Sequence, residues 1–280
     1  MTLLSPTTVE TVTATTLSGL TDLPARPSMR DTLSQTVTLA WRALKKMQRN
    51  FEQMFDVTIQ PILFTAMFAG IFGGAISGDV ESYLPIIITG LIGQTVLTAC
   101  VATGVQIRED MDKGVFDRFK SLPIARIAPL VGPAIADLLR YGTAASLTIL
   151  TGILMGYRPG GGVAGVLGGW LMTVIAGWSL AWIFTWFGTV ARSAQAVQGI
   201  SMMVMFPLTF LSNAFVPADT LPSWLQTFVR LNPVSHVVTA VRTMMAGGGV
   251  TTEVAWALGG CAAVVAVFMP LAVRSYSRKM

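Results

Sequence analysis

The sequence has few charged residues, and long stretches of the chain have none. Only 12% of its 280 residues are Asp, Glu, Lys or Arg, while 52% are hydrophobic. A soluble globular domain carries about 25% charged residues. The uncharged runs cover 57–78, 82–107, 159–191, 193–218 and 254–273. Each run reaches the roughly 20 residues that a helix needs to cross a bilayer. This composition excludes a water-soluble globular protein.

Six such segments predict the fold class. A sixth apolar segment, about 134–156, is interrupted only by Asp137 and Arg140. Because a helix satisfies its own backbone hydrogen bonds in lipid, we expect an all-α integral membrane protein with six transmembrane helices. One transmembrane domain would occupy 32–280, preceded by a disordered cytoplasmic tail, 1–31, that lacks the features of a secretory signal. The expected spans are about 57–78, 84–107, 134–156, 163–188, 197–217 and 254–273.

Residues that perform chemistry are equally scarce. The chain has two cysteines, one histidine and no Cys/His cluster, so it offers no zinc site. It has no Gly-Lys dipeptide and therefore no P-loop, and neither G-x-S-x-G nor H-E-x-x-H occurs. We expect no metal site, no cofactor bound by this chain and no enzyme acting alone. The glycine triplets at 160–162 and 247–249 are expected to be flexible turns.

Basic residues collect on one side of the predicted spans. Of the 19 Lys and Arg, 15 fall on the side of the N-terminus, three fall on the other side, and Arg140 lies within a span. Since basic residues stay in the cytoplasm, we expect a multi-pass protein of the cell (plasma) membrane with both termini cytoplasmic. The net charge of +5 would then meet anionic lipid headgroups rather than nucleic acid.

The segment before the first predicted span has the pattern of an amphipathic helix. Over residues 32–55, apolar residues recur every three or four positions, with basic residues between them. Trp41, Leu44 and Phe51 belong to the apolar set. This pattern favours a helix lying in the membrane interface, with an ordinary cytosolic helix as the alternative.

The largest predicted cytoplasmic loop covers 108–133. Its apolar stripe consists of Val115, Phe116, Phe119 and Leu122, and Pro123 would end the helix that carries it. A short exposed helix with two phenylalanines is typical of an element that docks into a groove of another protein. The alternative is that the stripe packs on the cytoplasmic ends of the chain's own helices.

The outer loop, 218–253, is divided by prolines and rich in aromatic residues. Trp224 and Phe228 lie on the apolar face of a short amphipathic segment, as expected at a membrane–water boundary. Asn232 and Pro233 form a plausible hinge, because the residue before a proline is biased away from helix. We expect short re-entrant helices that form a movable lid, or alternatively a static cap.

Asp137 and Arg140 are the only Asp, Glu, Lys or Arg residues expected inside a span. At a spacing of three residues they share a helix face and can pair with each other. Ionisable groups at membrane depth usually face the interior of the bundle. We therefore interpret them as a structural pair or as residues that line a substrate entrance.

Two motifs resemble the ABC-2 type export permeases, and within them the permeases of the daunorubicin/doxorubicin-resistance exporters of actinobacteria. The first runs from Arg108-Glu109 through Gly114-Val-Phe-Asp117-Arg118 to Leu122-Pro123-Ile-Ala-Arg126. The second runs from Phe210 to Pro217 and continues through Leu221-Pro-Ser-Trp224 to Asn232-Pro-Val-Ser-His236. The resemblance covers about 35–275.

The resemblance implies a transport subunit that works with a separate ATPase, which would hold the ATP and Mg²⁺. Two copies of that ATPase would join two permeases, the second being another copy of this chain or a paralogue. The substrate would be a hydrophobic or amphipathic compound, such as an anthracycline or a complex lipid. A non-transporting membrane scaffold and a proton-coupled secondary transporter are the rival functions.

The resemblance also implies roles for individual residues. Residues of the first motif would couple the permease to the ATPase: Arg108, Glu109, Gly114, Phe116, Asp117, Phe119, Leu122 and Pro123. Residues of the second motif would form the outer re-entrant lid: Pro217, Trp224, Phe228, Asn232 and Pro233.

Overall fold

The computed structural model of the chain describes residues 29–49, 51–77, 80–115, 128–215 and 222–278. No β-strand occurs within these ranges, which confirms the all-α class. The helices that they contain are α2 (Met29–Arg49), α3 (Phe51–Ser77), α4 (Val80–Asp112), α6 (Ala128–Leu154), α7 (Gly162–Val190), α8 (Ala194–Phe210), α9 (Ser223–Leu231), α10 (Pro233–Ala246) and α11 (Thr252–Arg278).

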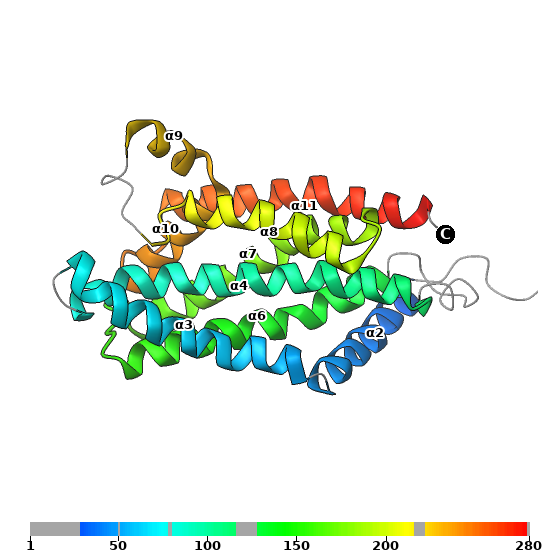
Figure 1. The fold of residues 1–280 in the computed structure, drawn as a ribbon, viewed down its shortest axis with the longest axis horizontal. Helices are drawn as coiled ribbons and strands as arrows, with labels where there is room; N and C mark the ends of the chain where they lie inside the picture. The colour runs from blue at the N-terminus through cyan, green and yellow to red at the C-terminus, as the bar shows by residue number, and fades with distance from the viewer. Residues whose placement is uncertain (1–28, 50, 78–79, 116–127, 216–221, 279–280) are drawn as a thin grey trace, which may run out of the picture.

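The longer helices of the bundle run along the long axis of the molecule in alternating directions (Figure 1). They are α3, α4, α6, α7, α8 and α11. Helix α2 lies obliquely at the same end of the molecule as the C-terminus of α11, and α9 and α10 lie at the other end (Figure 1). We call these the α2 end and the α9 end. The segments that the sequence assigns to one side of the membrane therefore gather at one end of the molecule.

The helices differ in how well they suit a membrane by length and composition alone. Among the described residues, Ser82–Asp112, Gly162–Val190 and Thr252–Arg278 are long and apolar enough to cross one. Val57–Ile71 and Ala194–Phe210 are shorter apolar helices. Helix α6 carries Asp137 and Arg140, both buried. Three spans are thus clear, and the predicted count of six remains a prediction.

Helices α4 and α7 form the centre of the bundle and approach each other through glycines. A Cβ atom added to Gly104 of α4 would lie 2.3 Å from the carbonyl oxygen of Phe184. One added to Gly188 of α7 would lie 2.4 Å from the carbonyl oxygen of Gly104. Small residues allow such close approach between membrane helices, where packing replaces the hydrophobic effect as the force that holds helices together. The core also contains the fully buried rings of Trp182, Tyr141 and Phe184.

Glycines also fasten the α9 end, contrary to the prediction that the triplet at 160–162 is a flexible turn. The backbone N–H of Gly161 donates to the carbonyl oxygen of Met245 across 2.8 Å. Cβ atoms added to Gly161 and Gly165 would lie 2.4 and 2.3 Å from the carbonyl oxygen of Met244. The triplet is a close-packed joint between the start of α7 and the end of α10. Gly247 ends α10 with a φ of 95°, in the left-handed region that favours glycine.

Candidate functional site

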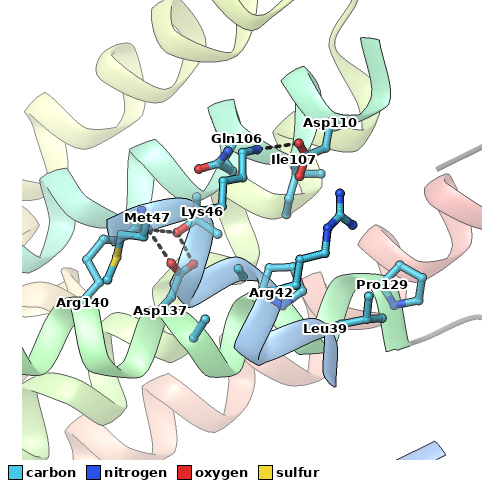
Figure 2. Close-up of a pocket in the computed structure, with 14 residues that line it drawn as sticks. Leu39, Arg42, Lys46, Met47, Gln106, Ile107, Asp110, Pro129, Asp137 and Arg140 are labelled. Carbon is cyan, nitrogen blue, oxygen red and sulfur yellow. Dashed lines mark hydrogen bonds and ion pairs between the residues drawn. The ribbon is translucent and has the colours of Figure 1, made fainter. Parts of the chain in front are cut away.

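A cavity of about 60 Å³ lies between α2, α4 and α6 at the α2 end. Figure 2 shows its lining side chains, with Arg42 and Lys46 of α2 facing residues of α4 and α6. Most of the lining is apolar, and the polar groups include three cations and two acids. The residues that line the cavity are Leu39, Arg42, Ala43, Lys46, Met47, Thr103, Gln106, Ile107, Asp110, Pro129, Pro133, Ala136, Asp137 and Arg140.

One face of α2 forms a wall of this cavity because it packs tightly on α6. A Cβ atom added to Gly132 of α6 would lie 2.6 Å from the Cβ of Leu39. Thr36 and Ala40, on the same face, are buried. The Lys46 ammonium donates to the Asp110 carboxylate of α4 across 2.6 Å and so ties α2 to a second helix. Helix α2 is thus held between two long helices.

The other face of α2 is apolar and exposed. Leu33, Val37 and Trp41 recur every four residues and are 66%, 65% and 62% exposed. The Lys45 ammonium lies 5.1 Å from the centre of the Trp41 ring, within the range of a cation–π interaction. An apolar stripe flanked by basic side chains, as predicted, suits a helix in the membrane interface.

The boundary of this helix differs from the prediction. The structure ends α2 at Arg49 and begins α3 at Phe51, so 32–55 is not one helix. Leu44 lies on α2 and is half-buried, whereas Phe51 belongs to α3, and its side chain lies outside the described structure. The apolar period continues across the break, which is why the sequence pattern did not reveal it.

Asp137 and Arg140 form an ion pair in the wall of the cavity. Their Oδ1 and Nη2 atoms are 2.9 Å apart. Figure 2 shows the pair on the side of the cavity away from Pro129. The spacing of three residues along α6 correctly predicted this contact. The pair also lines the cavity, and the alternative that it lies at a substrate entrance stays a prediction.

Further hydrogen bonds compensate for the burial of these charges. Thr103 of α4 donates to Asp137 Oδ2 across 2.7 Å and lies 2.8 Å from the Tyr141 hydroxyl. Arg140 donates to the carbonyl oxygen of Ala99 across 2.8 Å. Its Nε has no hydrogen-bond partner among the described residues. Burying an ion pair costs less when hydrogen bonds satisfy its remaining atoms, and Thr103 supplies one from a different helix.

A second group of polar side chains lies between α4 and α8. Ser201 and Thr209 share a buried face of α8, and their hydroxyls have no hydrogen-bond partner in the described part of the chain. On α4, Thr98 contacts the Met205 sulfur across 3.8 Å, and the buried Oε1 of Gln94 is also unpaired within the described residues. We call Gln94, Thr98, Ser201 and Thr209 the polar seam.

Within the polar seam, Thr98 donates to the carbonyl oxygen of Gln94 across 3.1 Å, but Ser201 and Thr209 differ from most other hydroxyls in the described helices. Thr143, Thr148 and Thr173 each donate to the carbonyl oxygen four residues earlier in their helix. Ser201 and Thr209 do not. Buried polar atoms without partners are costly, so such atoms call for water or a polar ligand in some state of the protein. Pro207 lies inside α8 between the two hydroxyls and weakens that helix locally.

The residues of the predicted ATPase-coupling motif are described only in part. Phe116, Asp117, Phe119, Leu122 and Pro123 lie outside the described residues. The predicted loop starts too early, because α4 continues to Asp112 and a turn follows in which Gly114 has a φ of 66°.

The described part of this motif is held at the end of α4. Arg108 pairs with Asp112 and donates to the carbonyl oxygen of Ala191 across 2.9 Å, which joins the ends of α4 and α7. Glu109 lies 3.0 Å from Lys113 and raises the pKa of that ammonium by hydrogen bonding. A force applied to this loop would therefore reach two central helices together.

The outer motif lies at the α9 end, but its aromatic face is open. Trp224, Phe228 and Leu231 are 65%, 56% and 77% exposed, and Pro217 lies outside the described residues. Within the described structure, α9 packs chiefly on α10, and its role as a lid or a cap stays a prediction. An apolar face that would be costly in water can be covered by lipid.

The helix break predicted at Asn232 and Pro233 is confirmed. Asn232 has extended backbone, with φ −74° and ψ 119°, and Pro233 is the first residue of α10. The side-chain amide of Asn232 donates to the carbonyl oxygens of Leu208 and Leu211 across 2.8 and 2.9 Å. Its Oδ1 accepts from the N–H of Val234. Asn232 therefore anchors the break to the end of α8.

Arg242 was not predicted as a site residue. Its guanidinium donates to the carbonyl oxygen of Asn213 across 3.0 Å and to Thr89 of α4 across 3.2 Å. No carboxylate lies within ion-pairing distance of it among the residues with described positions. A lone arginine in the otherwise uncharged stretch 233–246 was the signal that sequence reasoning passed over.

Comparison with known proteins relates most of the chain to permeases of ABC transporters. The model of the family described as ABC-2 type transporter matches residues 34–246. The chain is 40% identical over 277 residues to the daunorubicin resistance ABC transporter permease protein DrrB1 of Streptomyces coeruleorubidus, which covers 98% of each protein. It is 25% identical over 250 residues to the probable doxorubicin resistance ABC transporter permease protein DrrC of Mycobacterium tuberculosis, covering 86% of this chain and 88% of that protein.

Proposed function

The chain belongs to the ABC-2 type transporter family and is a permease subunit of an ABC exporter, and we propose that it moves amphipathic, ring-containing drugs from the inner leaflet. The names of its relatives support this substrate class, since two of them refer to daunorubicin and doxorubicin. A complex lipid is the other candidate cargo. The observation that carries the proposal is the cavity beside α2, which combines an apolar lining with a buried ion pair.

The proposed arrangement places the α2 end in the cytoplasm. The distribution of basic residues along the sequence supports this orientation. All six long helices would then cross the bilayer, with α6 carrying its ion pair inside the bundle. The exposed stripe of Leu33, Val37 and Trp41 would lie in the inner-leaflet interface, and α9 would rest on the outer leaflet.

The cavity is the entrance in a closed state. Drug-sized ligands occupy pockets of about 300–1,000 Å³. The cavity of about 60 Å³ is too small for such a ligand and would have to widen. Widening would separate α2 from α4, because α2 packs closely on α6 but is joined to α4 by the Lys46–Asp110 ion pair. Substrate would then enter sideways between α2 and α4 and meet Arg140 and Asp137.

The rival function of proton-coupled transport finds little support in this geometry. Asp137 is the acid predicted within a span, and it is paired with Arg140 and hydrogen-bonded by Thr103. Protonating Asp137 would leave the buried Arg140 without its counter-charge, which is costly, so this acid is poorly suited to carry protons. We infer instead that a separate ATPase, in two copies, drives a pair of permeases.

Transport in inverted membrane vesicles tests this function. Vesicles that contain the chain and its ATPase should accumulate daunorubicin when ATP is added, and vesicles whose ATPase lacks the P-loop lysine should not. Accumulation that needs no ATPase and stops when ionophores collapse the proton gradient would establish a secondary transporter. A folded complex that hydrolyses ATP without moving any anthracycline or lipid would favour a scaffold.

The coupling role of the loop after α4 has its own test. Truncating an aromatic anchor at an interface often costs more than about 2 kcal/mol, or roughly thirtyfold in affinity. Phe116→Ala or Phe119→Ala should therefore weaken capture of the ATPase and abolish ATP-driven transport while the protein still inserts. Phe55→Ala, at an exposed site on α3, is the matched control. Normal capture and transport in both loop variants would assign the coupling role elsewhere.

A further inference from the structure

His236, the chain's single histidine, lies where three helices meet at the α9 end. From α10, its Nδ1 lies 3.0 Å from Oε2 of Glu253 in the first turn of α11. Its Nε2 lies 3.0 Å from the carbonyl oxygen of Arg230 in the last turn of α9. The ring also stacks on Trp256 of α11, with centres 6.5 Å apart. The imidazole is therefore the link between α9 and α11.

Both ring nitrogens face atoms that can only accept. A carbonyl oxygen has no proton to donate, and neither has an ionised carboxylate. Neutral imidazole carries one N–H, so it can donate to only one of these two acceptors, whereas imidazolium donates to both. The last carbonyls of a helix also lack partners within the helix and attract a positive charge. The two hydrogen bonds are complete only when His236 is protonated.

Among the contacts given for the described residues, few others join α9 to the bundle. Val229 is its buried residue, while the apolar side chains of Trp224, Phe228 and Leu231 are exposed. Figure 1 shows α9 standing away from the long helices at this end of the molecule. Asn232, the residue that follows α9, is anchored to α8 by its side-chain amide. This anchor holds the C-terminal end of α9 but not the rest of the helix. The bond from His236 to Arg230 is therefore well placed to decide whether α9 stays docked.

We propose that His236 is a proton-sensitive clasp that holds α9 against α10 and α11 when it is protonated and releases α9 when it is neutral. The histidine side chain changes its charge between about pH 5 and 8. The charged groups around it are few in the described structure. Glu253 faces it from α11, the side chain of Arg230 on α9 is exposed, and Arg242 of α10 is bonded to Thr89 and Asn213 instead. Acidification thus docks α9, and a rise in pH loosens it.

Cysteine accessibility in lipid nanodiscs tests the clasp without reference to transport or orientation. Val229→Cys, in a background with Cys100→Ala and Cys261→Ala, places a thiol under the docked helix. Ser223→Cys, on the exposed start of the same helix, serves as the reference. The ratio of the two maleimide labelling rates cancels the pH dependence of thiol reactivity, so it reports only the undocking of α9.

The ratio should rise about tenfold from pH 5.5 to pH 8, as expected for the loss of one hydrogen bond made by a charged group. In His236→Gln, which cannot titrate, it should stay constant. Glu253→Gln offers an amide N–H to Nδ1, so neutral imidazole can satisfy both partners and the rise of the ratio with pH should largely disappear. A ratio that does not depend on pH in the unaltered protein, or that changes equally in His236→Gln, would overturn the clasp. So would an undiminished dependence on pH in Glu253→Gln.

Discussion

The two ends of the molecule are held together by different kinds of contact. At the α2 end, ion pairs such as Lys46 with Asp110 and Asp137 with Arg140 surround a cavity, although α2 also packs closely on Gly132 of α6. At the α9 end, backbones touch directly at Gly161 and Gly165, and a Cβ atom added to Gly90 would lie 1.8 Å from the carbonyl oxygen of Ala214. Contacts between mobile side chains can be exchanged, whereas backbone packing through glycine must be broken outright.

This difference indicates which end of the molecule opens first during transport. In this structure the α2 end already has a cavity, and its wall α2 packs on α6 but is joined to α4 by the Lys46–Asp110 ion pair. The α9 end has a joint without room for a methyl group. We infer that substrate entry begins with movement of α2, while the α9 end stays closed until the exporter changes state. The polar seam between α4 and α8 would become hydrated when the α9 end opens.

The largest expected effect comes from leaving one charge of the α2 end unpaired. Asp137→Asn alone should destabilise the protein by about 3–5 kcal/mol, because Arg140 then stays buried without a counter-charge. Asp137→Asn combined with Arg140→Gln should cost less, since neither partner is charged. The loss of monodisperse protein on heating in detergent measures both variants. An equal or larger loss in the double variant would show that the pair is not what stabilises this end.

A smaller effect is expected from a single methyl group at the α9 end. Gly161→Ala places its Cβ against the carbonyl oxygen of Met244 and should cost about 1–3 kcal/mol, the usual range for overpacking. Gly199→Ala is the matched control, because no atom lies within 4 Å of its added Cβ. The control should be neutral or slightly stabilising in the same heating assay. If the two substitutions behave alike, the close-packed joint is not a real constraint.

The smallest effect on stability should come from the ion pair that closes the cavity. Lys46 and Asp110 are partly exposed, with 37% and 21% of their side chains accessible, so their coupling should stay below about 1 kcal/mol. A double-mutant cycle with Lys46→Gln and Asp110→Asn measures it. A coupling of several kcal/mol would mean that α2 is locked rather than free to move.

The sequence predicted the features that depend on local pattern. Long uncharged runs located α7 and α11, and a spacing of three residues predicted that Asp137 meets Arg140. The apolar and basic residues before the first span indicated α2, and Pro233 indicated the break before α10. Each of these follows from residues that are neighbours in the chain, so periodicity or spacing reveals it.

Features that depend on contact between distant segments could not be predicted. Thr103 meets Asp137 across 34 positions of sequence, and no local pattern marks it as a partner. Gly161 was interpreted as a loose turn, because its tight neighbour, Met244, lies in another helix. The end of α4 was predicted too early, and the break between α2 and α3 was not predicted. Apolar and charged residues continue across both boundaries. Tertiary packing decides these positions.

The most direct test of substrate entry through movement of α2 is to cross-link α2 to α4 and measure whether transport stops. In a Cys100→Ala and Cys261→Ala background, Lys46→Cys and Asp110→Cys can be joined by a short thiol-reactive linker that contains a reducible disulfide. ATP-driven accumulation of daunorubicin in inverted vesicles should fall to background when the linker is in place and should return when it is reduced. Full accumulation of daunorubicin in vesicles whose permeases are completely cross-linked would contradict entry beside α2, because substrate would then enter without movement of that helix.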